Sequence, residues 1–432
     1  MENLFHIEEK GSKLGTELIA GLTTFFSMAY IIFVNPGMLS ITGMDYSAVM
    51  IATCLAAALG CFLTALLGNV PFAQAPGMGL NAFFTFTICG QMGYTWQQGL
   101  TIVLISGILF LIIAISPLRG KVIASIPLPL KKAIGAGIGL FIALIGLLNA
   151  GVVTANNNLL DLGSITTGSA LLALIGLVIT AILMAWKIKG AMLIGIIVTT
   201  IIGIPLGVTS FQAPDAAKFA LTTFFQFDFG GLLSLGVLPL ITAILTFALV
   251  DMFDTVGTLI GTAGSAGMLD DEGNLAGGDM AIVADAIATC TGAMLGTSTV
   301  TTYIESSTGI SEGGRTGLTP VVTGLLFLIF IPLAIFGQII PGAATAPALI
   351  IVGVLMLKSA GDIEWSDFEV ALPCFLTIVI MPFSYSISNG IGFGFISYML
   401  IKLCRGKAKE IPVLVYIISC LFVALYVLSS LI

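Results

Sequence analysis

The chain has 432 residues, of which 58% are hydrophobic and only 9% are charged, and its net charge is −7. Soluble domains carry about 25% charged residues, so this composition excludes a soluble globular fold and indicates a polytopic membrane protein. The low content of basic residues also gives no support for nucleic-acid binding.

The chain begins with a polar segment, residues 1–16, which has no apolar signal-peptide core and is expected in the cytoplasm. Fifteen apolar stretches follow, and a membrane-spanning helix needs roughly 20 such residues. They lie near 17–37, 46–68, 73–88, 98–117, 132–150, 167–186, 190–207, 236–260, 279–294, 297–310, 318–337, 346–358, 368–385, 387–404 and 411–431. Because several are short, we expect fourteen true spans, with one segment re-entrant or lying along the membrane.

Lysine and arginine predict the orientation, because cytoplasmic loops are enriched in them. With the N-terminus inside, the basic residues between or after spans all fall on the cytoplasmic side: Arg119, Lys121, Lys131, Lys132, Lys187, Lys189, Arg315, Lys402, Arg405, Lys407 and Lys409. We therefore predict a multi-pass protein of the cell (inner or plasma) membrane, embedded in the lipid bilayer, with a cytoplasmic N-terminus.

Two of the apolar stretches are interrupted at matching positions, third in each of two sets of about seven spans. Residues 71–86 read PFAQAPGMGLNAFFTF, and residues 295–310 read LGTSTVTTYIESSTGI. Paired interrupted segments of this kind indicate a transporter site between two inverted repeats. Each predicts an extended piece followed by a half-helix whose free N–H groups face a substrate near the membrane midplane.

Four acidic residues stand in or at the ends of consecutive apolar stretches: Asp251, Asp254, Asp285 and Glu305. Ionisable residues at membrane depth are costly, rare and usually functional. The cluster therefore predicts a polar cavity inside the membrane that binds a solute, a cation or both.

Asp251 and Asp254, in LVDMFDTVGTLIG, are three residues apart and so share a helical face. Two carboxylates this close in a dry site do not both ionise, so one is expected to hold a proton, which suits proton coupling. The alternative is a helix–helix hydrogen bond or a capped loop end. Asp285 has either a structural or coupling role or none.

Glu305, in TTYIESSTGI, is followed by the hydrogen-bonding residue Ser306. A carboxylate here can accept two N–H bonds from a planar heterocycle, or it can pin the broken helix. The amide of Asn81 offers donors and acceptors that match a purine, although polar residues also join membrane helices. Phe26 can stack on a flat ligand or simply pack.

The sequence has no motif for metal binding, cofactor binding, ATP-driven pumping or catalysis. The only histidine is His6, and the seven cysteines are scattered, so neither a metal site nor a cofactor is predicted. The chain has no P-loop and no HExxH or GxSxG motif, which argues against a pump or an intramembrane enzyme.

The segments LVDMFDTVGTLIG, TSTVTTYIESSTGISEGGRTGLTPVVTGLLF and APGMGLNAFF together resemble the nucleobase–cation symporters, of the nucleobase–ascorbate transporter superfamily. The likeness is greatest to the branch of guanine/hypoxanthine and adenine permeases and runs from about residue 14 to the C-terminus. Many relatives have a glutamate in span eight, where this chain has Asp251 and Asp254. Many also have Glu-Asn in span ten, where this chain has Glu305 followed by Ser306.

The resemblance implies an all-α fold of fourteen spans in two inverted seven-span repeats, with short β-strands in the broken spans three and ten. A core domain would comprise residues 17–128 and 236–340, and a gate domain, which often forms a homodimer contact, residues 129–210 and 345–432. The core would move against the gate like an elevator. The substrate would lie between Glu305, Asp254 or Asp251, and Asn81.

We therefore expect an importer of purine bases driven by protons, with a sodium ion as the other candidate coupling ion. Glu305 and one aspartate of span eight would bind the base, with Asn81, Ser306 and Phe26 nearby. The other aspartate, with Asp285, would carry the proton. The rival interpretations are another solute on the same fold (uracil, xanthine or an inorganic anion), a channel, a membrane-embedded enzyme and a structural membrane protein.

Overall fold

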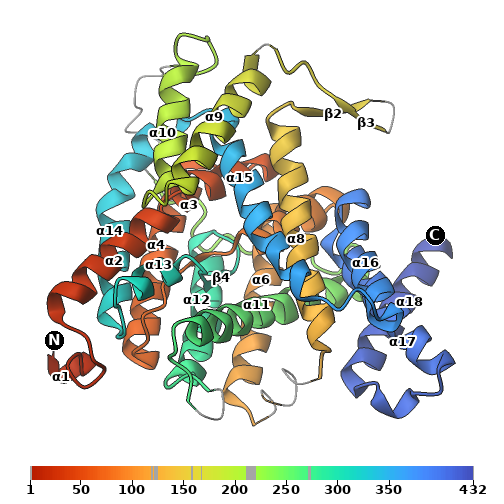
Figure 1. Ribbon diagram of the computed structural model, residues 1–432. Coiled ribbons are helices and arrows are strands. Elements are labelled where there is room, and N and C mark those ends of the chain that lie inside the picture. The colour runs from red at the N-terminus through yellow and green to blue at the C-terminus, as the bar shows by residue number, and fades with distance from the viewer. Residues whose placement is uncertain are drawn as a thin grey trace.

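The computed structural model describes residues 2–117, 120, 125–156, 159–166, 168–210, 220–270 and 274–431. Figure 1 shows an almost entirely helical molecule with its two termini on opposite sides. Arg119 and Lys121, two of the residues used to predict the orientation, lie outside the described residues.

The first half of the chain carries helices, two of them π-helical, and three short strands. Their bounds are α1 Glu2–Phe5, α2 Leu14–Met28, α3 Ile31–Leu39, η1 Ser40–Thr42, α4 Tyr46–Leu63, η2 Thr64–Gly68, β1 Gln74–Pro76, α5 Met78–Ala82, η3 Phe83–Gln91, α6 Trp96–Ile115, α8 Leu128–Asn149, β2 Val153–Asn156, β3 Leu159–Leu162, α9 Gly168–Ala185 and α10 Ala191–Gly203.

The second half repeats the order of a strand followed by a short helix in its third segment. Its elements are α11 Val237–Ser265, α12 Gly278–Leu295, β4 Val300–Thr302, α13 Ser306–Ser311, α14 Leu318–Phe330, η5 Ile331–Ile339, α15 Gly342–Leu357, η6 Lys358–Asp362, α16 Phe368–Phe383, α17 Ile387–Cys404, η7 Ala408–Glu410 and α18 Val413–Leu431.

Among the described residues, nine helical segments are long and apolar enough to cross a membrane, and four shorter apolar helices accompany them. Every one of the fifteen predicted apolar stretches contains helix. The prediction of an all-helical polytopic membrane fold is therefore confirmed.

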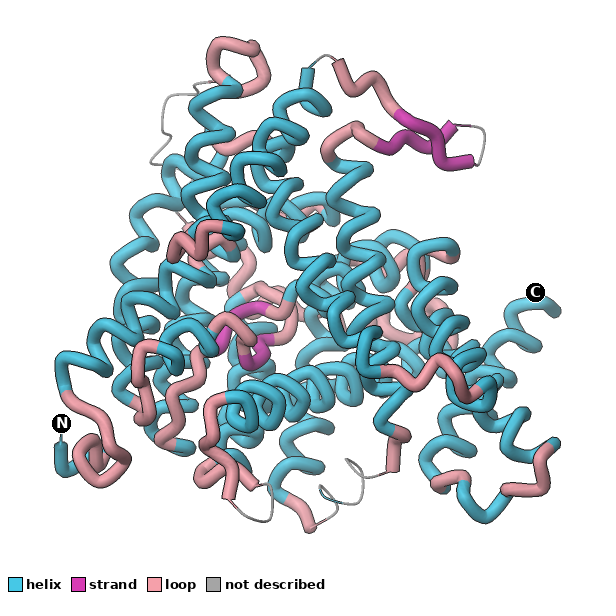
Figure 2. Tube along the Cα trace, viewed as in Figure 1, coloured by secondary structure: helices cyan, strands magenta, loops and turns pink. Residues whose placement is uncertain are grey.

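The two interrupted segments meet at the centre of the molecule. Strands β1 and β4 pair antiparallel, with Gln74 opposite Thr302 and Pro76 opposite Val300. Figure 2 shows this pair enclosed by helices, while the β2–β3 hairpin projects at one edge. Each strand leads into a short helix, α5 or α13. The predicted arrangement of an extended piece followed by a half-helix is therefore confirmed in both halves.

Glycines allow α8 to pack closely between α15 and α16. A methyl group added at Gly137 would lie 2.6 Å from the sulfur of Met381 on α16, and one at Gly139 would lie 2.8 Å from the carbonyl oxygen of Gly353 on α15. Small residues at helix contacts serve this purpose in membrane proteins, where apolar burial alone does not drive helix association.

The first predicted span is broken, which the sequence pattern did not predict. Helix α2 ends at Met28 and α3 begins at Ile31, so Tyr30 lies at the interruption. Its ring is only 1% exposed. The break therefore places a buried phenolic hydroxyl in the middle of an apolar stretch.

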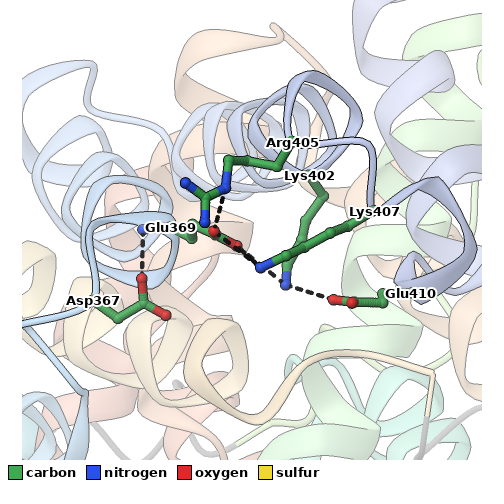
Figure 3. A network of polar contacts seen from close by, with 6 residues as sticks. All are labelled: Asp367, Glu369, Lys402, Arg405, Lys407 and Glu410. Carbon is green, nitrogen blue, oxygen red and sulfur yellow. Dashed lines mark hydrogen bonds and ion pairs between the residues drawn. The ribbon is translucent and has the colours of Figure 1, made fainter.

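A charged network joins the start of α16 to the end of α17 and the segment that follows it (Figure 3). The Glu369 carboxylate contacts Arg405 at 2.8 Å, Lys407 at 2.9 Å and Lys402 at 3.4 Å. Lys402 also pairs with Glu410 at 2.9 Å. Three cations thus surround one carboxylate at the ends of these helices.

Candidate functional site

The site forms where α11 and the β4–α13 segment approach each other. Glu305 directly precedes α13 and is half-buried, whereas Asp254 lies on α11 and is exposed. The two carboxylates are close enough to interact electrostatically. The structure therefore brings together two of the predicted binding residues at one accessible position.

Tyr30 fixes the Glu305 side chain. Its hydroxyl donates a hydrogen bond of 2.7 Å to Oε1 of Glu305. The neighbouring Tyr303 hydroxyl donates to the carbonyl oxygen of Pro76 at 2.6 Å, which ties the segment after β4 to β1. The broken first span and the strand pair thus position the same carboxylate.

Helix α2 holds α13 in place by close contact. A methyl group on Gly309 would lie 2.6 Å from the carbonyl oxygen of Ala20, so only glycine fits there. The Thr308 hydroxyl donates to Ser27 Oγ at 3.1 Å. These contacts explain why a six-residue helix keeps a fixed position.

Asn81 lies on α5 and is completely buried, yet neither its amide nitrogen nor its amide oxygen has a hydrogen-bond partner. The buried hydroxyl of Thr24 on α2 is also unpartnered. Buried polar groups are nearly always hydrogen-bonded, so such exceptions point to a group that the isolated chain does not supply. A ligand with donors and acceptors would satisfy Asn81.

An exposed stripe of α11 leads away from Asp254 toward the end of the helix. It contains Gly257, Gly261 and Gly264, all exposed and spaced to lie on one face. A methyl group on Gly257 or Gly261 would meet no other atom within 4 Å. The exposed carboxylate of Asp254 therefore shares an open face of α11 with three glycines.

The N-terminal segment is held to the chain on either side of the two interrupted segments. Lys10 donates to the carbonyl oxygen of Asn69 at 2.6 Å, and Ser12 donates to that of Gly313 at 3.1 Å. Along α11, on the N-terminal side of Asp254, residues 246–248 and 250–252 are buried.

Asp251 and Asp285 lie in a closed environment behind the strands. They are 1% and 0% exposed. Thr289 donates to Asp251 Oδ2 at 2.7 Å, and Gln74 and Thr302 each contact Asp285 Oδ1 at 3.2 Å. Asp251 and Asp254, predicted to share one helical face, therefore have different surroundings.

Ser306 and Phe26 have protein contacts of their own. The buried Ser306 hydroxyl accepts a hydrogen bond of 3.0 Å from the N–H of Ala73, which connects α13 to the segment before β1. The Phe26 ring is 39% exposed and packs edge-on against Phe25 at 5.7 Å. Neither contact involves Asp254 or Glu305.

The sequence interpretation did not single out the residues that contact the acids, among them Tyr30, Gln74, Thr289 and Thr302. A tyrosine in the middle of a predicted span could have indicated a polar contact, because a buried hydroxyl needs a hydrogen-bond partner. The threonines gave no comparable signal, because a threonine in a membrane helix commonly bonds its own backbone.

A sequence model described as the permease family (Xan_ur_permease) matches residues 15–393. Adenine permease AdeP of Escherichia coli is 44% identical over 425 residues, covering 98% of this chain and 95% of that protein. Guanine/hypoxanthine permease PbuG of Bacillus subtilis is 41% identical over 442 residues, covering 99% of each chain.

Two solved structures share the fold at low sequence identity. The transmembrane domain of the cyanobacterial bicarbonate transporter BicA has a TM-score of 0.63 at 17% identity and covers 87% of this chain and 97% of its own. The inward-facing murine anion transporter Slc26a9 has a TM-score of 0.68 at 11% identity and covers 91% of this chain and 69% of its own.

Proposed function

The chain belongs to the permease family of nucleobase–cation symporters, and from this premise we propose that it imports purine nucleobases such as guanine, hypoxanthine or adenine. It is a transporter rather than an enzyme. The names of the relatives support a purine: they include an adenine permease and a guanine/hypoxanthine permease, each similar over nearly the whole chain.

One observation carries the proposal. The exposed Asp254 and the half-buried Glu305 are close enough to interact electrostatically, and carboxylates suit the N–H groups of a purine because they accept paired hydrogen bonds from planar donors. Asn81, buried and unpartnered, supplies a donor and an acceptor to the base and tunes specificity. Ser306 and Phe26 complete the surroundings of the base. Ser306 holds the segment before β1 in place, and Phe26 stacks on the base.

A proton drives uptake. The site region holds four acids in membrane-embedded segments, Asp251, Asp254, Asp285 and Glu305, and a buried carboxylate without a cation is most stable when protonated. Protonation and substrate binding then favour the same state of the carrier, which is the basis of symport. A sodium ion is the alternative coupling ion, and ion replacement during uptake separates the two.

The architecture proposed from the resemblance fits this function. Fourteen spans form two inverted repeats, the N-terminus is cytoplasmic, and residues 17–128 and 236–340 form a core that moves against a gate of residues 129–210 and 345–432. The gate is the contact of a homodimer. The strand pair β1–β4 links the two halves of the proposed core directly.

The test is uptake of radiolabelled hypoxanthine and adenine into cells that lack their own purine permeases. We expect concentrative uptake that a protonophore abolishes and that unlabelled guanine or adenine blocks. Competition by xanthine and uracil measures the breadth of the site. Uptake that competes only with uracil, xanthine or an inorganic anion would contradict the purine assignment, and downhill flux without accumulation would indicate a channel.

A further inference from the structure

We propose that the ion pair between Lys189 and Glu312 is a latch between the gate and the core, closed in this structure and opened each time the core moves. A second contact of the same kind, from Lys131 to the ring of Phe253, accompanies it. The inference rests on the proposed function, because it takes from there the division of the chain into a core and a gate.

The first argument is the position of the ion pair. Lys189 lies in the turn between α9 and α10, which belong to the proposed gate, and its Nζ is 2.7 Å from Oε1 of Glu312. Glu312 directly follows α13, the short helix of the proposed core that Glu305 precedes. The pair therefore connects a turn of the gate to the helix that follows a candidate substrate carboxylate.

The turn beside Lys189 lies directly against helix α2 of the core. A methyl group added at Gly190 would be 3.3 Å from both Cβ and the carbonyl oxygen of Phe26. Gly190 has a φ of 74°, a conformation that favours glycine. Because α2 also contacts α13, the turn approaches two elements of the core at once, and this approach brings Lys189 within reach of Glu312.

The second contact lies beside the other candidate carboxylate. The Nζ of Lys131, near the start of α8, is 5.1 Å from the centre of the Phe253 ring on α11. This distance is within the range of a cation–π interaction. Phe253 directly precedes Asp254 in the chain. A lysine of the gate therefore contacts each of the two core segments that carry a candidate substrate carboxylate.

The exposure of the ion pair suits a contact that must break and form again. The side chains of Lys189 and Glu312 are 52% and 32% exposed. An ion pair in such surroundings contributes little free energy and is weakened by salt. It can therefore open in every transport cycle, and while it is closed it favours the position of the core seen in this structure.

The experiment locks the latch chemically. The exposed Cys404 and Cys420 are first replaced by serine. Lys189→Cys and Glu312→Cys are then introduced together, and a short, reducible reagent with two thiol-reactive ends joins the new cysteines in purified protein in proteoliposomes. We expect transport of labelled hypoxanthine or adenine to be lost and to return after reduction, while the locked protein still binds the base. Mass spectrometry of the linked peptides verifies the cross-link.

A matched control uses an ion pair inside the gate. Lys132 on α8 and Asp362 at the end of η6 are 3.5 Å apart, and both belong to the proposed gate. The variant Lys132→Cys with Asp362→Cys, treated with the same reagent, is expected to transport at the rate of the untreated protein. The comparison separates a lock between core and gate from an unspecific effect of cross-linking.

Charge reversal tests the ion pair without a reagent. Lys189→Glu and Glu312→Lys should each change the KM for hypoxanthine by about two- to fivefold, the range expected for an exposed ion pair. Both changes should have the same direction, because both weaken the same contact, and the double variant should recover the original KM. Lys131→Met keeps the apolar stem and removes the charge, and its KM should shift in that direction too.

Transport at the full rate by a carrier with a verified 189–312 cross-link would overturn the inference. So would equal loss of transport in the control pair, loss of base binding by the locked protein, or a double charge-reversal variant that recovers nothing. Wild-type protein that binds and transports no base would refute the proposed function itself, whereas transport by the locked carrier would refute only the latch.

Discussion

Two regions of this protein hold carboxylates in different surroundings: Glu369 at the ends of α16 and α17, and the pair Asp251–Asp285 inside the molecule. Glu369 is surrounded by Lys402, Arg405 and Lys407 (Figure 3). Asp251 and Asp285 have hydroxyl and amide partners instead. Where three cations compensate the charge, a carboxylate can stay ionised and join helices. Where only neutral dipoles are present, burial disfavours the charged form of a carboxylate, and no cation offsets that cost.

The largest expected effect comes from neutralising the two carboxylates of the candidate site. Glu305→Gln and Asp254→Asn should each abolish concentrative uptake of hypoxanthine or guanine, because each amide replaces an acceptor by a donor toward the N–H groups of the base. Radiolabelled uptake, with membrane levels measured by immunoblot, is the assay. Glu364→Gln, at an exposed position in the segment before α16, serves as the matched control. Full uptake by either site variant would contradict the assignment of that residue to substrate binding.

The next effect tests whether the exposed face of α11 beside Asp254 takes part in transport. Gly257→Leu should reduce the uptake rate by about tenfold or more, because the side chain fills the open face of α11 one turn from the carboxylate. Gly15→Leu, in helix α2, is the control, since an added methyl group there also meets no atom within 4 Å. Both changes raise helix propensity, so a difference between their uptake rates reports the role of this face of α11. Equal rates for the two variants would contradict that role.

A smaller effect is expected from Tyr30→Phe. It removes the 2.7 Å hydrogen bond to Glu305, and a bond to a charged group contributes about 1.5–3 kcal/mol. The half-buried Glu305 remains, so transport continues, with KM raised by about tenfold or more. The measurement is KM and maximal rate for hypoxanthine. An unchanged KM would mean that Tyr30 only fills space.

Glu369→Gln should alter stability without altering transport. Removing the carboxylate leaves Lys402, Arg405 and Lys407 facing one another, and we expect the melting temperature in detergent to fall by a few degrees. The loss should shrink at high salt, since salt screens the remaining repulsion. A loss of hypoxanthine affinity in this variant would show that Glu369 takes part in substrate binding and does not only join helices.

The smallest effect concerns Asp228, which caps the segment before α11. Hydrogen bonds from the N–H of Gly231 and the amide of Gln98, both 3.0 Å long, hold the pKa of this carboxyl below its ordinary value. Its contribution to stability is present above the pKa of the unfolded chain, about 4, and is lost as the pH falls through the lower, folded pKa. Asp228→Asn should therefore narrow the difference in melting temperature between neutral and acidic pH.

The sequence predicted the helical membrane fold and the two interrupted segments because both leave a local signal. A long apolar stretch identifies a span, and Pro76, Gly77 and Gly79 mark the break before α5. The acids were found for the same reason, since a carboxylate in an apolar stretch is conspicuous. Their separation into an accessible pair, Asp254 and Glu305, and a buried pair, Asp251 and Asp285, was not predictable, because it depends on which helix faces each side of α11.

The break at Tyr30 escaped prediction for a physical reason. The surrounding residues are apolar helix formers, and the only proline, Pro36, lies six residues further on. The interruption is stabilised by tertiary contacts, among them the bond to Glu305 from a segment 275 residues away. Local propensity carries no information about such a partner.

The pairing of β1 with β4 has a consequence for biogenesis. Gln74 and Thr302 are 228 residues apart and hydrogen-bond each other, so β1 must wait for most of the chain to be synthesised before its partner exists. During that interval the polar groups around β1, including Asn81, have no strand opposite them in the bilayer, where unpaired backbone groups are costly. The nascent first half is therefore expected to need protection by the insertion machinery, and the site is assembled only after insertion of the second half has passed residue 302.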